Sequence, residues 1–268
     1  MPEPRYRLIV LDLDGTLLNE HSKISPRTRE ALERAHAAGV AVAVATGRSY
    51  SLTRYFCGDL PLSGPQISYN GAIIVDPLTE QPIFLQAVPA VMVDPVITFL
   101  QERDIFTCYY TEDTIYVLDH SPMEVALVPP DLPQPVRVPD FGRLSHLPCI
   151  KLVAVGEQAR ITDLRSPAEI AFGDHLYVTR TSPVLLEFLH PAVSKGAALQ
   201  QVIDSLGLSR DQVIAFGDSH NDIGMLRIAG TGVAMGNADA EIRAVADVIA
   251  PRNSDDGIAR VLDDLLWS

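Results

Sequence analysis

Short apolar runs alternate with amphipathic stretches over the first part of the chain. Residues 8–11 form one apolar run, and residues 40–45 form a second that is built from alanine and valine. Continuous β-prone runs are typical of strands buried on both faces of a parallel sheet. Between them, Ser25-Pro26 precedes the stretch 27–38, and serine followed by proline favours the start of a helix. A helix over 49–56 and a strand over 66–69 are expected next, before the turn-forming pair Asn70-Gly71.

The same alternation returns in the last part of the chain. The pattern predicts helices over 195–206, 222–229, 240–246 and 256–266, and strands over 213–216, 232–235 and 248–250. Strands that alternate with helices are typical of a doubly wound parallel sheet with right-handed crossovers. We therefore predict the α/β class, with a Rossmann-like core.

The middle of the chain has a different pattern. Two strand-like runs, 106–110 and 114–118, are separated by three turn residues and predict a hairpin. Further strands over 150–155 and 176–179 flank a helix over 160–172, and a proline-rich stretch before them predicts an irregular connection. We expect an inserted α+β domain over residues 83–189, with residues 1–82 and 190–268 forming the core.

Composition narrows the classes of partner and compartment. The 268 residues are 47% hydrophobic and carry a formal net charge of −13, which argues against nonspecific binding to nucleic acid or to an anionic membrane. The three cysteines lack metal-binding spacing, as expected for buried free thiols in a reducing compartment. Without a signal-like segment or an apolar run near 18 residues, we expect a cytoplasmic protein.

Candidate chemistry begins directly after the first predicted strand. Asp12 and Asp14 are two residues apart and are followed by Gly15, so two carboxylates stand at one strand end where the chain turns. Like charges this close repel unless a cation lies between them, and carboxylate oxygens suit a hard cation such as Mg²⁺. The alternative is an ordinary strand end with a solvated turn.

Three other loops of the predicted core carry matching groups. They are Thr46-Gly47-Arg48 after the second strand, Lys195 at a helix start with Ser194 as its N-cap, and the segment Gly217-Asp218-Ser219-His220-Asn221-Asp222. Sites in open parallel sheets form at the carboxyl ends of the strands, where these loops converge. Carboxylates, a hydroxyl, a lysine and loop N–H groups suit phosphoryl transfer, in which aspartate can be the nucleophile. The GxxxxGK[ST] and GxSxG motifs are absent.

These four segments resemble the four motifs of the haloacid dehalogenase-like phosphatases. The first extends over Leu11-Asp12-Leu13-Asp14-Gly15-Thr16-Leu17-Leu18, and the third is Ser194-Lys195-Gly196. Further stretches are similar to the Cof-type subfamily, which has a large α/β cap between the second and third motifs; they are Tyr69-Asn70-Gly71-Ala72, Gly232 to Ala238 and Asp256-Gly257. The resemblance implies a Mg²⁺-dependent phosphatase that hydrolyses small phosphate monoesters, with sugar phosphates as the leading substrate class.

The resemblance also implies a role for each residue. Asp12 would be the nucleophile and a metal ligand, and Asp14 would transfer protons while its main-chain carbonyl binds the metal. Asp218 would complete the metal site, with Asp222 in its outer shell. The residues implied in phosphate or substrate binding are Thr46, Gly47, Arg48, Lys195 and Asn221. For Arg48 a structural salt bridge is the alternative, and a turn is sufficient to explain Asn70.

Two other functions stay open at this point. A phosphosugar mutase would return the phosphoryl group to its substrate, and a non-catalytic phospholigand-binding regulatory protein would keep the fold without turnover. In every case the expected partner is a small phosphorylated metabolite, and the expected assembly is a monomer or a homodimer.

Overall fold

The computed structural model describes residues 4–120 and 128–267. The chain divides into two compact units, one formed by residues up to 84 together with residues from 194 onward, and the other by residues 85–193. The sequence places the corresponding boundaries at 82/83 and 189/190.

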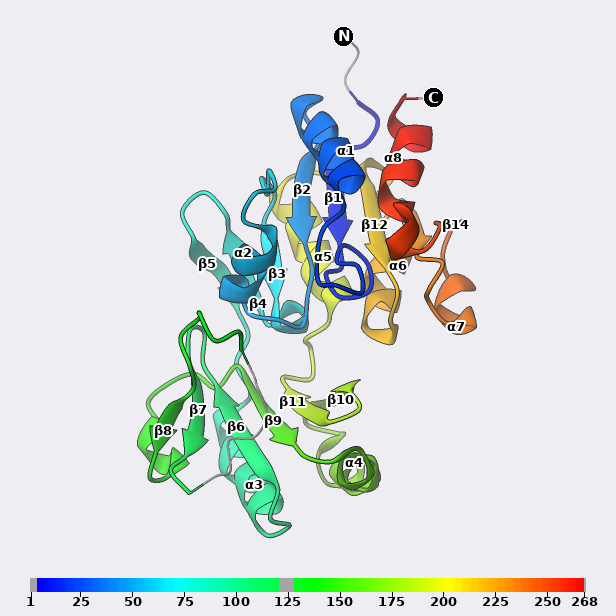
Figure 1. Ribbon diagram of the computed structural model, residues 1–268. Coiled ribbons are helices and arrows are strands. Elements are labelled where there is room, and N and C mark those ends of the chain that lie inside the picture. Colours follow the sequence, from blue (N-terminus) through cyan, green and yellow to red (C-terminus); the bar gives the residue numbers. More distant parts are fainter. Residues whose placement is uncertain (1–3, 121–127, 268) are drawn as a thin grey trace. The chain divides into compact units, whose positions relative to one another are not determined.

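The first unit contains the predicted parallel sheet (Figure 1). All neighbouring strands of this sheet are parallel, in the order β14 (Val248–Ile249), β13 (Thr231–Ala234), β12 (Val213–Gly217), β1 (Leu8–Leu11) and β2 (Ala41–Val44). The predicted α/β fold class is therefore confirmed.

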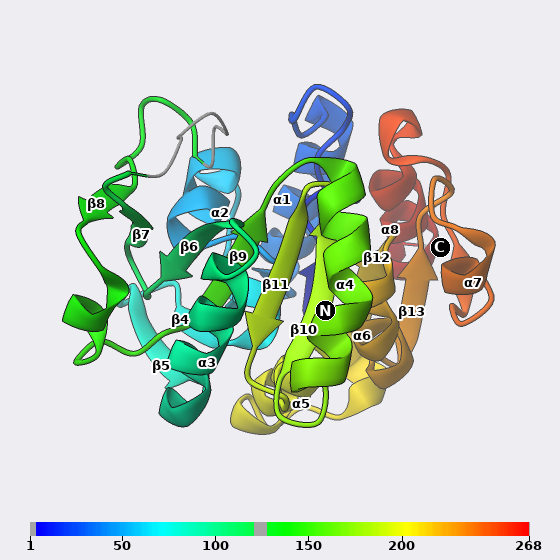
Figure 2. The same ribbon diagram turned by 90° about the horizontal axis from the view of Figure 1, so that it is seen from below.

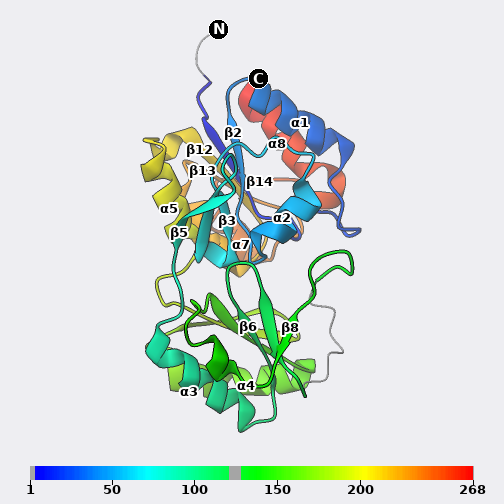
Figure 3. The same ribbon diagram turned by 90° about the vertical axis from the view of Figure 1, so that its left-hand side faces the viewer.

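Helices cover both faces of this sheet. The side chains of β1 illustrate how one strand packs against both helical layers. Ile9 and Leu11 pack into one apolar cluster, whereas Leu8 and Val10 pack into another on the opposite face. The first cluster includes residues of α1 (Pro26–Ala37) and α8 (Gly257–Trp267), and the second includes residues of α5 (Lys195–Ser205) and α6 (Ile223–Ile228). Figure 3 shows α1 and α8 on one side of the strands and α5 on the other. A strand between two such layers needs apolar side chains on both faces, which explains its continuous apolar run.

The register of the sheet aligns the carboxyl ends of its central strands. Leu11 pairs with Val44 on one side and with Phe216 on the other. The next residues continue this alignment, because the Asp12 N–H donates to the Phe216 carbonyl oxygen at 2.9 Å. The loops that follow β1, β2 and β12 therefore leave the sheet at the same edge.

A small antiparallel sheet adjoins β2 in this unit, and the sequence pattern predicts only its first strand. Its order is β3 (Gln66–Ser68), β4 (Ile73–Asp76) and β5 (Gln81–Leu85). An isolated bridge between Ala45 and Ile67 joins it to the end of β2.

The remaining elements of the unit are α2 (Tyr50–Cys57), α7 (Ala240–Arg243), and the short 3₁₀ turns η1 (Tyr69–Gly71), η3 (Arg210–Gln212), η4 (His220–Asp222) and η5 (Asn253–Asp255).

The second unit is an α+β module built on a six-stranded sheet. The strand order is β10 (Tyr177–Ser182), β11 (Leu185–Leu189), β9 (Lys151–Val155), β6 (Phe106–Tyr110), β7 (Ile115–Leu118) and β8 (Val136–Val138). Helices α3 (Ala90–Gln101) and α4 (Gln158–Phe172) pack against this sheet (Figure 2), and the 3₁₀ turn η2 (Phe141–Leu144) lies between β8 and β9.

Several elements differ from the sequence-based expectations. Helix α3 was not predicted because its valines and Pro95 favour other structures, yet Val96, Ile97 and Leu100 bury its inner side. Strand β8 interrupts the connection expected to be irregular, and β11 was also missed. The helix predicted over 240–246 ends at Arg243, because the Asp247 N–H donates to the Gly232 carbonyl and leads the chain into β14.

Cys57, Cys108 and Cys149 are free and buried, as predicted. Among the described residues, no helix is both long enough and apolar enough to span a bilayer.

Candidate active site

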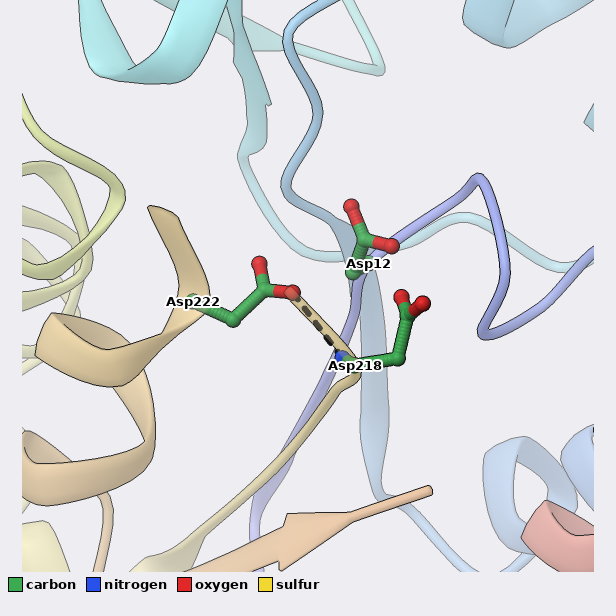
Figure 4. Close-up of side chains that lie close together, drawn as sticks. All are labelled: Asp12, Asp218 and Asp222. Atoms are coloured by element: carbon green, nitrogen blue, oxygen red, sulfur yellow. Dashed lines mark hydrogen bonds between the residues drawn. The ribbon is translucent and has the colours of Figure 1, made fainter. Parts of the chain in front are cut away.

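Three carboxylates meet where β1 and β12 end (Figure 4). Asp12 follows β1 directly, Asp218 follows β12, and Asp222 ends the short turn η4. One oxygen from each lies within 4.8 Å of the others. The predicted convergence of Asp12 with the distant acidic loop is therefore present in the structure.

Lys195 joins two of these carboxylates from the first residue of α5. Its Nζ donates to Asp12 Oδ1 at 2.5 Å and to Asp222 Oδ1 at 2.7 Å, and the side chain is only 1% exposed. Ser194 caps the helix by accepting from the Ala197 N–H, as predicted. Burial on its own lowers the pKa of Lys195, but the two carboxylates outweigh it and raise the pKa overall. Lys195 is therefore a fixed ammonium beside Asp12.

Asp222 holds the loop after β12 together. Its Oδ2 accepts from the backbone N–H groups of Asp218 and Ser219, both at 3.0 Å, while Oδ1 accepts from Lys195. Figure 4 shows the bond to the Asp218 N–H as a dashed line. Both oxygens of Asp222 therefore already accept hydrogen bonds, and its expected outer-shell position at the metal stays a prediction.

The cluster has the electrostatics of a divalent-cation site. Three carboxylates and one ammonium leave two negative charges uncompensated, and Asp12 Oδ2 is buried without a hydrogen-bond partner among the described residues. Burial, followed by repulsion from Asp222, raises the pKa of Asp218 to about 6 and raises that of Asp12 well above its ordinary value, against the opposing effect of Lys195. A bound divalent cation would relieve this repulsion, and the all-oxygen donor set suits a hard ion.

Asp218 is oriented by Thr16 and Asn237, two residues to which the sequence motifs assign no role. Thr16 Oγ1 donates to Asp218 Oδ1 at 2.9 Å, and the Asn237 amide donates to the Gly15 carbonyl at 2.8 Å and to Asp218 Oδ2 at 3.4 Å. Gly15 has φ of +81°, and a Cβ there would collide with the Asp218 carboxylate. The glycine after Asp14 thus permits both the turn and the close approach of Asp218. Thr16 and Asn237 do lie in the motif-like stretches, which was the available signal.

Asp14 is not part of this cluster, and its carboxylate pairs with Arg48. The guanidinium binds the carboxylate through two hydrogen bonds, Nε to Oδ2 at 2.7 Å and Nη2 to Oδ1 at 2.6 Å. The structure therefore supplies the salt bridge considered for Arg48, and a substrate contact stays a prediction. The Asp14 side chain is about half exposed, with a side-chain exposure of 52%, whereas Asp12 is buried.

The other predicted phosphate-binding residues lie close to these carboxylates in the fold. Thr46 follows β2 and is buried, and its Oγ1 accepts from the Arg48 N–H at 3.1 Å. Asn221 donates to Asn70 at 2.9 Å. Its contact with phosphate stays a prediction, as do the assigned roles of Thr46 and Gly47.

Comparisons with known proteins identify the family of this chain. A family model described as haloacid dehalogenase-like hydrolase matches residues 9–262. A pyridoxal phosphate phosphatase of Escherichia coli is 30% identical over 275 residues, covering 96% of this chain and 97% of its own length. A 5-amino-6-(5-phospho-D-ribitylamino)uracil phosphatase of Bacillus subtilis is also 30% identical, over 261 residues, covering 96% of this chain and 94% of its own.

A solved structure supports the same assignment. The fold matches a sugar phosphatase of haloacid dehalogenase subclass IIB with a TM-score of 0.81 and 25% identity, covering 96% of this chain and 98% of that one. The expected family is thus confirmed by the family model, by the relatives and by the fold. The chain belongs to the haloacid dehalogenase-like hydrolases and, among them, to the Cof-type phosphatases.

Proposed function

We propose that this enzyme hydrolyses small phosphate monoesters with Mg²⁺ as its metal, through a phosphoryl group carried on Asp12. The observation that carries the proposal is the buried Asp12 carboxylate, which has one oxygen bound by Lys195 and the other without a partner among the described residues. A carboxylate fixed in this way is prepared to act as a nucleophile, because its orientation needs no further ordering.

The proposed reaction has two displacements at phosphorus. An oxygen of Asp12 bonds to phosphorus while the ester P–O bond breaks, and Asp14 donates a proton to the leaving oxygen. Asp14 then takes a proton from water, whose oxygen bonds to phosphorus while the bond between phosphorus and Asp12 breaks. Lys195 and the Thr46 hydroxyl supply donors to the phosphoryl oxygens, whose charge is distributed during transfer.

The Asp12 and Asp218 carboxylates, together with the Asp14 main-chain carbonyl, would hold Mg²⁺. When bound, it would reduce the repulsion between the phosphate dianion and the carboxylates. Thr16 and Asn237 would keep Asp218 oriented toward it.

The substrate class is proposed from the relatives and the family resemblance. The two phosphatases similar to this chain are named for small phosphorylated molecules, and the similar solved structure is named as a sugar phosphatase. We propose a sugar phosphate or a related phosphorylated metabolite. A screen of such compounds, with the two named phosphate esters included, would rank kcat/KM for each and identify the substrate.

Asp12→Asn tests the mechanism while preserving the shape of the side chain. We expect hydrolysis of an aryl phosphate with Mg²⁺ to fall by about 10³-fold or more, because an amide is a poor nucleophile. Asp59→Asn is the matched control, since Asp59 has a side-chain exposure of 89%, and its activity should be unchanged. Undiminished hydrolysis by Asp12→Asn would overturn the mechanism.

A mutase is the remaining alternative within the same fold. It would return the phosphoryl group to a sugar phosphate and release little inorganic phosphate. Release of one phosphate for each ester consumed would therefore favour the phosphatase.

A further inference from the structure

A buried amide beside the candidate active site has an unused donor. The Asn70 side chain is 1% exposed, and its Nδ2 has no hydrogen-bond partner among the described residues. A buried donor without a partner loses the free energy of its hydrogen bonds to water, so such groups are rare and call for an explanation. An asparagine whose only role is to adopt the backbone conformation of a turn does not require its side-chain amide to be buried.

A chain of hydrogen bonds determines which atom of the Asn70 side-chain amide lacks a hydrogen-bond partner. Ser219 Oγ donates to Asn221 Oδ1 at 2.6 Å, and Asn221 Nδ2 donates to Asn70 Oδ1 at 2.9 Å. Each carbonyl oxygen in this chain accepts from the residue before it. The Asn70 NH₂ group is therefore the terminal donor.

The backbone holds Asn70 in an uncommon conformation. Tyr69 and Asn70 both have positive φ, at 51° and 58°. The Asn70 N–H donates to the Thr46 carbonyl at 2.9 Å, and the Tyr69 N–H donates to the Arg48 carbonyl at 3.0 Å. Two successive non-glycine residues in the left-handed region cost free energy, and such strain concentrates at functional sites.

The turn packs against two of the loops that are proposed to bind phosphate. A Cβ on Gly47 would lie 3.2 Å from Asn70 Oδ1 and 3.3 Å from Nδ2, so the amide lies against the loop after β2. A Cβ on Gly71 would lie 2.5 Å from the carbonyl oxygen of Ser194, which precedes Lys195. Asn70 thus stands where the loop of Thr46 and the start of α5 come together.

We propose that Asn70 is a substrate-binding residue whose Nδ2 donates a hydrogen bond to an oxygen of the phosphoryl group. Asn221 positions it by holding its Oδ1, so Asn221 acts on phosphate through Asn70. The inference rests on the proposed phosphatase function and adds a donor to it.

Two variants separate this role from a purely structural one. Asn70→Asp keeps the shape and the bond from Asn221 but replaces the donor with a charged acceptor. Asn70→Gly removes the side chain and accepts the positive φ without strain. If the donor binds phosphate, Asn70→Asp is the more damaging variant, because it adds repulsion. If the side chain only supports the turn, Asn70→Gly is the more damaging one.

The readout is the affinity for inorganic phosphate and for orthovanadate, measured by competition against an aryl phosphate with Mg²⁺. We expect both inhibition constants to rise by about 10-fold in Asn70→Gly and by about 100-fold in Asn70→Asp, with kcat/KM reduced in the same order. Asn19→Asp is the matched control, since its Oδ1 accepts from backbone N–H groups in a surface turn and an aspartate keeps both bonds. Its inhibition constants should equal those of the wild type.

The outcomes for the two proposals are distinct. Wild-type hydrolysis that disappears in Asp12→Asn supports the phosphatase function whatever Asn70 does. If Asp12→Asn is inactive, two results would overturn the assignment of Asn70 alone. One is that both Asn70 variants have inhibition constants within about twofold of wild type. The other is that Asn70→Gly loses more phosphate affinity than Asn70→Asp. A wild type that neither hydrolyses the ester nor binds phosphate would overturn both proposals.

Discussion

Arg48 holds the Asp14 carboxylate in a two-point hydrogen bond, with Nε at 2.7 Å and Nη2 at 2.6 Å from the two carboxylate oxygens. The guanidinium also stacks over the Phe56 ring, 4.7 Å from its centroid. Two parallel bonds fix the plane of the carboxylate as well as its position. The group proposed to exchange protons with the leaving oxygen and with water is therefore oriented before substrate binds.

Arg48→Lys should weaken leaving-group protonation more than binding. Lysine keeps the charge but loses the planar fork, so we expect kcat/KM to fall by about 10-fold for an alkyl phosphate, whose leaving oxygen needs a proton. The loss should be smaller for an aryl phosphate with an acidic leaving group.

The control for Arg48→Lys is a second arginine–aspartate pair on the same unit. Arg34 donates to Asp263 at 2.5 Å on the surface, and Arg34→Lys should leave both substrates unaffected. Equal losses for the alkyl and aryl esters in Arg48→Lys would contradict a role in protonation.

Lys195→Met should destabilise the fold as well as abolish activity. The substitution leaves Asp12 and Asp222 buried without their shared cation. Removing one partner of a buried pair costs about 3–5 kcal/mol, which is roughly a 10 °C decrease in melting temperature for a chain of this size. Lys23→Met, at an exposed position, should melt as the wild type does in calorimetry. If Lys195→Met had an unchanged melting temperature, the ion pairs of Lys195 with Asp12 and Asp222 would not be buried as described.

Mg²⁺ should stabilise the protein more at neutral than at acidic pH. Burial and the neighbouring Asp222 raise the pKa of Asp218 to about 6. Because the folded state binds this proton more tightly than the unfolded state, the resulting stability is fully present below the unfolded-state pKa and is lost as pH rises through about 6. Mg²⁺ and the proton compete for this carboxylate.

Thermal melts at two pH values test this competition. We expect millimolar Mg²⁺ to raise the melting temperature by about 5 °C at about pH 7.5, and by much less at about pH 5. In Asp218→Asn the shift should be small at both pH values. An equal Mg²⁺ shift at both pH values in the wild type would rule out Asp218 as the titrating ligand.

Gly15→Ala should disable the metal site through a steric contact. The new Cβ would meet the Asp218 carboxylate, and φ at this position is +81°. Gly39 gives a control for strain alone, since it has φ of +88° and a Cβ added there would meet nothing within 4 Å. Both variants should lose about 1 kcal/mol of stability from the backbone. Only Gly15→Ala should lose Mg²⁺-dependent stabilisation and activity, and equal activities in the two variants would contradict the steric argument.

The sequence was sufficient to predict where the loops of the site converge. Strand ends are local features, and the parallel register then brings Asp12, Thr46 and Asp218 to one edge of the sheet. The pairing of side chains was not predictable in the same way. The spacing of Asp12 and Asp14 suggested that both carboxylates face one cation, but the turn at Gly15 leaves Asp14 with Arg48.

Residues that orient others lie in the motif-like stretches, but the sequence patterns did not show which side chains they would contact. Asn70 was sufficiently explained by the Asn-Gly turn, and only its burial and its bond from Asn221 show that the amide has a fixed direction. Thr16 and Asn237 act on Asp218 from positions 202 and 19 residues away in the chain. Helix α3 was missed because its inner face is stabilised by tertiary packing, which local propensity does not report.

The stereochemical course at phosphorus is the measurement that tests the central claim most directly. A thiophosphate monoester made chiral at phosphorus by sulfur and two oxygen isotopes would be hydrolysed in water enriched in the third isotope. Each in-line displacement inverts phosphorus, so transfer first to Asp12 and then to water predicts net retention of configuration in the released thiophosphate. Net inversion would mean a single displacement by water, and it would contradict a phosphoryl group carried on Asp12.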